Sequence, residues 1–241
     1  MSLKTIVVHV ESGQVGETRL ALAIRLAEEH GAHLVGAHPL GSLMVPAYPD
    51  SDPGLMVMMQ ELAEDERAKA RASFKQAVET RGLSSEWRSS DSDVSEGLTI
   101  DGRYADLVIV GQNEPDQNRF GTPPNLAADL VFTLGRPLLV VPYIGAPEAF
   151  RRVLVAWNAS REATRAIYDA LPLLRRAELV TVLAINPTGG RDGHGDIPCA
   201  DICLQLARHG VRAEADSLRA DDIRVGDMLL SRAADGDAHL I

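Results

Sequence analysis

Residues 4–38, KTIVVHVESGQVGETRLALAIRLAEEHGAHLVGAH, decide the fold because they contain one complete strand–helix–strand unit. Apolar runs stand at both ends of this stretch. Between them, apolar residues recur three, four and seven positions apart, at Leu20, Ala23, Ile24 and Ala27. This spacing predicts a helix with one buried face. Gly31 follows at the place where many helices end in the left-handed conformation.

The same order of elements begins again at residues 151–186, RRVLVAWNASREATRAIYDALPLLRRAELVTVLAIN. Each copy continues with a glycine- and proline-rich connection, a second helix, a polar strand and a third helix. Alternating helices and apolar strands are typical of a parallel sheet covered by helices, with polar strands at its edges. Residues 142–150, PYIGAPEAF, separate the copies. We therefore predict an α/β chain of two tandem domains, residues 1–145 and 146–241.

Composition and charge limit the partners of the chain. A net charge of -10 and a pI near 5.2 argue against general affinity for nucleic acid or anionic membrane, because both require a basic face. No run approaches the ~20 apolar residues of a membrane span. The apolar start is short and is followed at once by Glu11, which is unlike a signal peptide. We expect a cytoplasmic protein.

Three groups of side chains could carry chemistry, but a structural role is favoured for each. Cys199 and Cys203 lie four positions apart without further cysteines, and we read them as buried small residues. His9 and His38 fall near the carboxyl ends of neighbouring strands, where packed or hydrogen-bonded histidines are favoured over a metal site. Residues 55–59, LMVMM, could form a contact surface, but packing under the sheet is the favoured interpretation.

The two repeats, each opening with a V-x-V strand and a small-residue turn, and the strand PLLVVP at 137–142 resemble the universal stress protein family in its tandem form. The most specific stretch is RVLVAWNASREATRAIYDALPLL at 152–174, and the resemblance covers nearly the whole chain. It implies an open five-stranded parallel sheet with helices on both faces in each domain. It also implies pairing of the two domains within the chain, a homodimer, and a regulatory binding role in stress rather than an enzymatic one.

Members of the family that bind ATP carry G-x-x-G, nine residues and then G-[ST] after the fourth strand, so that backbone N–H groups surround the phosphates. In the first copy this motif falls on Gly111, Glu114, Pro124 and Asn125, of which only Gly111 matches. Glu114 would bring a carboxylate to the triphosphate, and Pro124 has no N–H to donate. The first phosphate loop is therefore degenerate.

Other residues of the first copy agree with this reading. Glu11 begins the turn after the first strand, a looser match to the family than the second copy shows. The pair Gly121 and Thr122 could act as a shifted G-[ST], but it shortens the spacer, and we favour a loop without phosphate chemistry. Asn125 is then the N-cap of the following helix. We predict that the first domain does not bind ATP.

The second copy stops at DAHLI, 237–241, before the counterparts of the phosphate loop and the last strand. A domain that lacks its last strand exposes an apolar edge, so we expect the natural chain to continue. A cofactor, ATP or AMP, is supported only if that continuation carries the motif. The competing function is then an ATP- or AMP-binding switch or slow ATPase, and the resemblance assigns its contacts to Ala156, Trp157, Asn158, Ser160 and Ile185. Asn158 stands where the family usually has Asp.

Overall fold

The computed structural model describes residues 2–41, 53–112, 122–188, 197–220 and 222–241. The chain divides into two compact units, Ser2–Ala146 and Pro147–Ile241. The division falls inside residues 142–150, the segment that the sequence analysis assigned to the linker.

The first unit is a doubly wound α/β domain, and its described residues contain a five-stranded parallel sheet in the order β3-β2-β1-β4-β5. This confirms the predicted fold class. The elements are β1 (Thr5–His9), α1 (Gln14–His30), β2 (His33–Pro39), α2 (Pro53–Arg81), β3 (Ser85–Ser90), α3 (Val94–Gly102), β4 (Leu107–Gly111), α4 (Leu126–Thr133) and β5 (Leu138–Val141).

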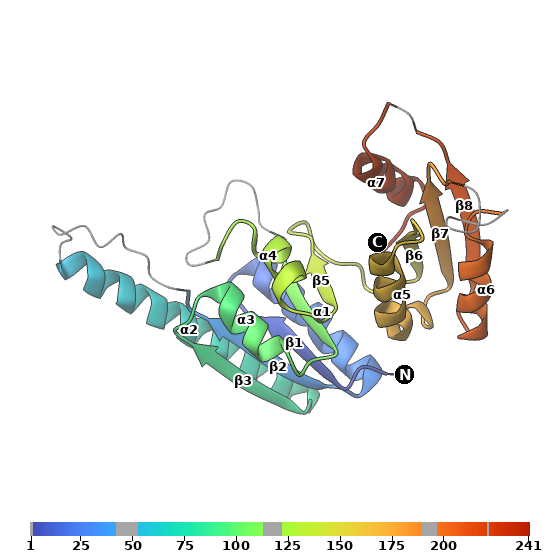
Figure 1. Ribbon diagram of the computed structural model, residues 1–241. Coiled ribbons are helices and arrows are strands. Elements are labelled where there is room, and N and C mark those ends of the chain that lie inside the picture. The colour runs from blue at the N-terminus through green and yellow to red at the C-terminus, as the bar shows by residue number, and fades with distance from the viewer. Residues whose placement is uncertain (1, 42–52, 113–121, 189–196, 221) are drawn as a thin grey trace. The chain divides into compact units, whose positions relative to one another are not determined.

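Helices cover both faces of this sheet (Figure 1). One core joins α3 and α4 to the sheet through buried residues such as Val7, Val108, Leu98 and Leu130. On the other face α1 packs against the central strands and α2 against β2 and β3. β1 and β4 are parallel neighbours at the centre of the sheet, and the chain continues from β1 to β2 on one side and from β4 to β5 on the other, so the order of the strands reverses between them.

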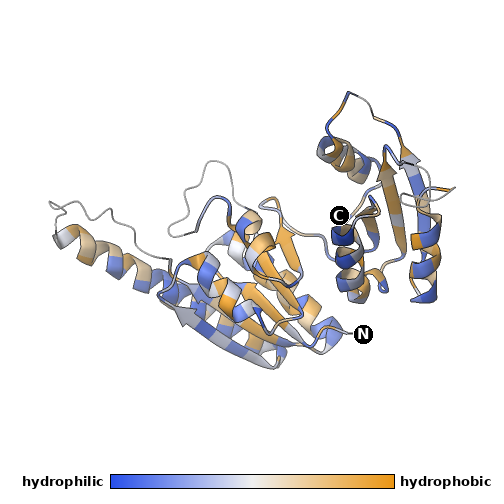
Figure 2. Cartoon of the chain, viewed as in Figure 1, coloured by the Kyte–Doolittle hydropathy of each residue, from blue (hydrophilic) through white to orange (hydrophobic). Residues whose placement is uncertain are grey.

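The predicted helix periodicity is confirmed in α1. Leu20, Ala23, Ile24 and Ala27 are all buried, with exposed fractions of 5% or less. Gly31 ends the helix with φ 61°, in the left-handed region that favours glycine. The polar strand β3 lies at the edge of the sheet, as predicted, and Figure 2 shows its hydrophilic residues beside the apolar central strands.

The second unit repeats the same order on a smaller scale. Its described residues form a three-stranded parallel sheet in the order β6-β7-β8. One core joins α5 and α6 to the sheet, and a second joins α7 to its other face. The elements are β6 (Arg152–Ala156), α5 (Arg161–Leu174), β7 (Leu179–Ile185), α6 (Ala200–Arg208), β8 (Ala213–Leu218) and α7 (Val225–Asp235).

Two details of the second unit differ from the prediction. Among the described residues the counterpart of β4 is not a strand but a single parallel bridge between Val153 and Leu240. The amide of Leu154 donates to the carbonyl of Leu240 at 2.9 Å. In addition, the sequence pattern predicts that the third helix of this unit begins at Asp221, which lies outside the described residues, whereas α7 begins at Val225.

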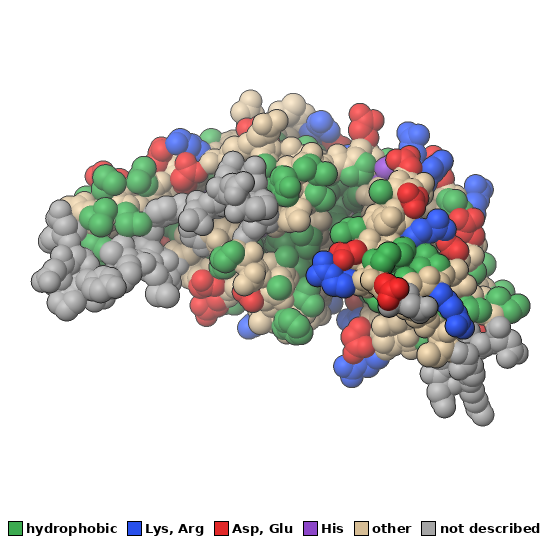
Figure 3. Space-filling model, turned by 90° about the horizontal axis from the view of Figure 1, so that it is seen from above, with side chains coloured by type: hydrophobic (Ala, Val, Ile, Leu, Met, Phe, Trp, Pro, Cys, Tyr) green, Lys and Arg blue, Asp and Glu red, His purple; other side chains and the backbone are tan. Residues whose placement is uncertain are grey.

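The interpretation of residues 55–59 as core was wrong. Leu55, Met56, Val57 and Met58 are 43% to 56% exposed, and Figure 3 shows apolar side chains on the surface of this part of the first unit. The helix is longer than the strands it covers, so it becomes buried only further along. Its buried positions are Ala63, Ala70, Phe74 and Val78.

The two cysteines take the structural role that the sequence favoured. Cys199 is 2% exposed and Cys203 is partly buried, and both pack in the core beneath α5 and α6. Burial raises the pKa of the Cys199 thiol to about 11 and also raises the pKa of Cys203. Both thiols are therefore protonated near neutral pH, and a protonated thiol is a poor nucleophile.

We predict that Cys199 resists alkylation in the folded protein. A pKa of about 11 instead of 9.0 lowers the thiolate fraction at pH 8 about 100-fold. Iodoacetamide pulses on folded and urea-unfolded protein, read by peptide mass spectrometry, measure this ratio, with Cys203 as the internal comparison. Equally fast labelling of Cys199 in both states would contradict the burial described.

Candidate functional site

A cleft of about 510 Å³ opens at the carboxyl ends of β1 and β2 in the first unit. It lies beside the reversal of strand order between β1 and β4. Open α/β sheets commonly bind ligands at such a switch point. The side chains that give this cleft its chemistry are His9, Glu11, Ser12, His38, Glu66 and Thr122.

Two glycines set the turn that carries Glu11. Gly13 has φ 87°, a conformation that side chains rarely adopt, and it precedes the first residue of α1. A Cβ at Gly16 would lie 2.1 Å from the carbonyl oxygen of Glu11. The start of α1 therefore passes close to the backbone of the turn, and Glu11 is held at the end of β1.

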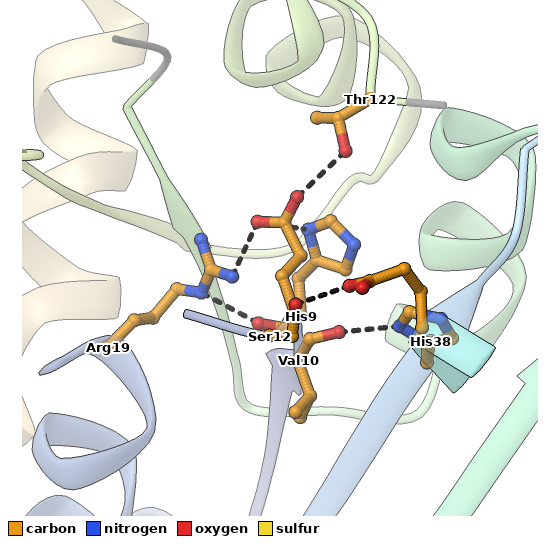
Figure 4. A network of polar contacts seen from close by, with 8 residues as sticks. His9, Val10, Ser12, Arg19, His38 and Thr122 are labelled. Atoms are coloured by element: carbon orange, nitrogen blue, oxygen red, sulfur yellow. Dashed lines mark hydrogen bonds and ion pairs between the residues drawn. The ribbon is translucent and has the colours of Figure 1, made fainter. Parts of the chain in front are cut away.

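A buried arginine fixes the carboxylate of Glu11. Arg19, on α1, has 0% exposure, and its Nε donates to the carbonyl of His9 at 2.6 Å. Its Nη2 donates to Glu11 Oε2 at 2.7 Å. The hydroxyl of Thr122 donates to the other carboxylate oxygen of Glu11 at 2.9 Å. Figure 4 shows Arg19 and Thr122, each joined by a dashed line to this carboxylate.

The remaining polar groups extend this network across the cleft. The hydroxyl of Ser12 donates to the carboxylate of Glu66, on α2. His38 Nδ1 donates to the carbonyl of Val10 at 2.7 Å, which joins the ends of β1 and β2. The described lining contains two carboxylates and no lysine or arginine, and among the described residues no cluster of acidic, histidine or cysteine side chains could hold a metal. The charged side chains of this lining are thus acidic.

In the structure, the need for glycine at position 111 has a different cause from the phosphate loop that the motif suggested. This glycine ends β4, and a Cβ at its position would lie 2.2 Å from Arg19 Nη1. Any larger residue would collide with the guanidinium that holds Glu11. Gly111 therefore makes room for the buried guanidinium of Arg19. This need for glycine does not depend on phosphate binding.

The other positions of the degenerate loop lie away from the cleft or outside the described residues. Glu114 lies outside the described residues. Pro124 and Asn125 are exposed. Asn125 occupies the N-cap position of α4, but its side chain makes no capping hydrogen bond, because φ -105° and ψ 19° turn it away from the extended conformation of a normal cap. The predicted N-cap position of Asn125 is confirmed, but the side-chain hydrogen bond of a cap is not formed.

In the second unit the candidate residues have local structural roles. Asn158 Oδ1 accepts from the amide of Ser160 at 3.1 Å, and the hydroxyl of Ser160 accepts from the amide of Ala163 at 3.1 Å, which caps α5. Trp157 packs with the core beneath α5 and α6. Ile185 packs with the core beneath α7, on the opposite face of the sheet.

Ala156, the last residue of β6, is exposed. Because Trp157 and Ile185 turn to opposite faces, the structure does not bring the five candidates of the second unit together around one cavity. Binding at these residues stays a prediction.

Sequence reasoning did not find Arg19, the group on which the first site depends. The signal was present, because Arg19 stands four residues before Ala23 and therefore on the apolar face of the helix. A charged residue on a buried face requires a partner, and Glu11 was available in the preceding turn. Glu66 and Thr122 have no such signal, since each meets the cleft from a segment distant in sequence.

Comparison with known proteins was made by sequence and by structure. No family model and no curated protein matches the chain by sequence. By structure, the chain is similar to a universal stress protein from Archaeoglobus fulgidus DSM 4304, with a TM-score of 0.69 and 11% identity over 97% of this chain and 82% of that one. This chain has the universal stress protein fold. A functionally unknown protein from Pseudomonas aeruginosa PAO1 matches with a TM-score of 0.52 and 16% identity over 98% of this chain and 79% of that one.

Within the universal stress protein fold, the cleft occupies the switch point of the complete sheet. None of the helices that the structure describes combines the length and apolar character needed to cross a membrane. The Arg19–Glu11 pair lies at the carboxyl end of β1 and can be tested directly.

We predict that Glu11→Ala destabilises the first domain by about 3–5 kcal/mol, because it leaves the Arg19 guanidinium buried without its carboxylate. Glu11→Gln should cost less, since an amide oxygen can still accept from Arg19. Urea unfolding in a Trp157→Phe background, where Trp87 is the remaining tryptophan, isolates the first domain.

The control is Asp65→Ala. Asp65 pairs with Lys69 at the same 2.7 Å, but on the exposed side of α2, so its loss should leave the midpoint almost unchanged. Equal effects of Glu11→Ala and Asp65→Ala would show that burial of the pair is unimportant.

We also predict that Gly111→Ala destabilises the first domain by about 1–3 kcal/mol through its collision with Arg19. In an Arg19→Ala background the same change should cost less, because the group that it strikes is gone. A double-mutant cycle measured by urea unfolding gives the coupling energy. A coupling of zero would assign the need for glycine to the strand or to the following loop.

Proposed function

We propose that this protein is a cytoplasmic universal stress protein of the tandem form, a regulatory binding module rather than an enzyme, whose first domain does not hold ATP. The observation that carries the proposal is the position of Glu11. Its carboxylate lies at the end of β1, in the cleft of the switch point, and Arg19 and Thr122 hold it there.

The electrostatics of the cleft support the exclusion of phosphates. A triphosphate placed at this edge would meet two carboxylates, Glu11 and Glu66, and no lysine or arginine of the described lining. Like charges in a partly buried site repel more strongly than they do in water. Arg19 does not compensate for a second anion, because its exposure is 0% and its Nε and Nη2 already bind protein oxygens.

The loop after β4 adds a second reason. A phosphate loop works through backbone N–H groups that point at the anion. Pro124 has no N–H, and Gly111 is placed against Arg19. Thr122, which a shifted motif would aim at a phosphate, donates its hydroxyl to Glu11 instead. A small ligand without phosphates agrees better with this arrangement.

We also propose that the protein forms a homodimer.

The test is native mass spectrometry of the purified protein, followed by calorimetric titration with ATP and AMP. We expect a protein that carries no nucleotide and shows no saturable heat with either compound up to about 1 mM. Stoichiometric ATP would contradict the expected absence of nucleotide, and ATP bound in the first domain would overturn the proposal. In that case Asn158→Ala decides the place: lost binding assigns ATP to the second domain, and unchanged binding to the first.

A further inference from the structure

The first turns of α2 carry an apolar stripe that the first domain leaves exposed. Leu55, Met58 and Leu62 recur at spacings of three and four residues, so they share one side of the helix. These three side chains, which we call the α2 stripe, are 44% to 53% exposed. Figure 1 shows that this end of α2 lies beyond the strands of the first sheet. A contiguous apolar surface of this kind is typical of a contact site.

A groove of about 360 Å³ lies between α1 and the opposite end of α2, and we call it the α1–α2 groove. From α1 it is lined by side chains that include Ala21 and Ile24. Its lining residues on α2 before the last one, Arg81, again recur at three- and four-residue spacing, namely Ser73, Gln76, Ala77 and Thr80. Because several of these side chains are small, a large apolar side chain from outside can lie between the two helices.

The α2 stripe and the α1–α2 groove lie on the same side of α2. Steps of three and four residues lead from Leu62 through Glu66 and Lys69 to Ser73, and such steps stay on one side of a helix. Met58 and Ala77 are nevertheless about 28 Å apart along the axis, at a rise of about 1.5 Å per residue. One straight helix cannot place its own stripe in its own groove, whereas a second copy of the chain can.

An antiparallel pair of α2 helices brings stripe and groove together twice. With a two-fold axis between residues 67 and 68, Met58 of one copy faces Ala77 of the other. In the same register Leu62 of one copy faces Ser73 of the other. A two-fold interface repeats each contact, so both stripes and both grooves are occupied.

Charge supports the same register. Glu66 of one copy faces Lys69 of the other, on both sides of the axis. These side chains are 42% and 56% exposed in the single chain, so they are accessible to a second copy. Opposite charges at the centre of the pair fix the antiparallel direction, because they face each other only in that direction.

We propose that two copies of this chain associate through antiparallel α2 helices, with the α2 stripe of each copy in the α1–α2 groove of the other. This inference rests on the homodimer of the proposed function, to which it assigns a surface. It does not rest on the exclusion of ATP.

The first experiment is sedimentation equilibrium of the full chain, with Met58→Asp as the deciding variant. A carboxylate in the apolar groove should weaken dimerisation at least about 10-fold. The matched control is Val57→Asp. Val57 is 56% exposed in the same turn but lies about 100° around the helix, away from the stripe. Its replacement should change the dimer affinity less than about 2-fold.

The second experiment uses charge reversal to test the register. Glu66→Lys and Lys69→Glu each place like charges opposite one another in a dimer of identical chains, whereas a mixed dimer of the two variants has opposite charges at both positions. The equimolar mixture should therefore associate at least about 3-fold more tightly than either variant alone, and the gain should shrink in high salt. Effects confined to one chain cannot produce this gain.

The outcomes separate this surface from the homodimer itself. A parent chain that stays monomeric up to about 100 μM would overturn both. A parent dimer that Met58→Asp leaves intact would overturn the α2 surface and leave the homodimer standing. A mixture of the charge-reversed variants that associates no better than its components would overturn the antiparallel register, and with it the proposal.

Discussion

A guanidinium with no exposure to water must be neutralised where it lies, and in this protein that requirement organises one end of the first sheet. Arg19 binds the carbonyl that ends β1 and the carboxylate of Glu11, and it presses against the last residue of β4. A helix, a turn and two strands are thereby fixed to a single group. A buried ion pair adds little net stability over apolar packing, but it tolerates few alternative arrangements.

The same group decides what the cleft can recognise. By drawing Glu11 to the carboxyl edge of the sheet, Arg19 places negative charge where an α/β fold usually offers positive backbone dipoles. The charge of Arg19 is neutralised by Glu11 inside the protein, and Arg19 itself is not part of the lining of the cleft. Arg19 thus accounts both for the glycine that remains in the degenerate loop and for the carboxylate of Glu11 in the cleft. The edge of the sheet at which such a fold can bind anions is lined by acidic side chains in this protein.

The fold could be predicted from sequence because its signals are local. The periodicity of α1, the left-handed Gly31 and the polar edge strand β3 each depend on a short window. The site depends on contacts between distant segments, so Glu66 gave no signal, and Thr122 gave one only as part of a shifted phosphate motif rather than as a partner of Glu11. Arg19 did give one, as a charge on an apolar face. The start of α2 was misread because an apolar run shows hydrophobicity but not whether the sheet extends beneath it.

In the second domain the polar side chains of the turn after β6 form hydrogen bonds within the turn and with the start of α5. Asn158 accepts from the amide of Ser160, and Ser160 caps α5. A molecule that engaged these side chains would compete with the helix for them, and a lost N-cap costs about 1 kcal/mol. Ligand binding at the loop after β6 and fraying of the first turn of α5 would therefore be linked equilibria. Binding at this loop would change the helical order at the start of α5.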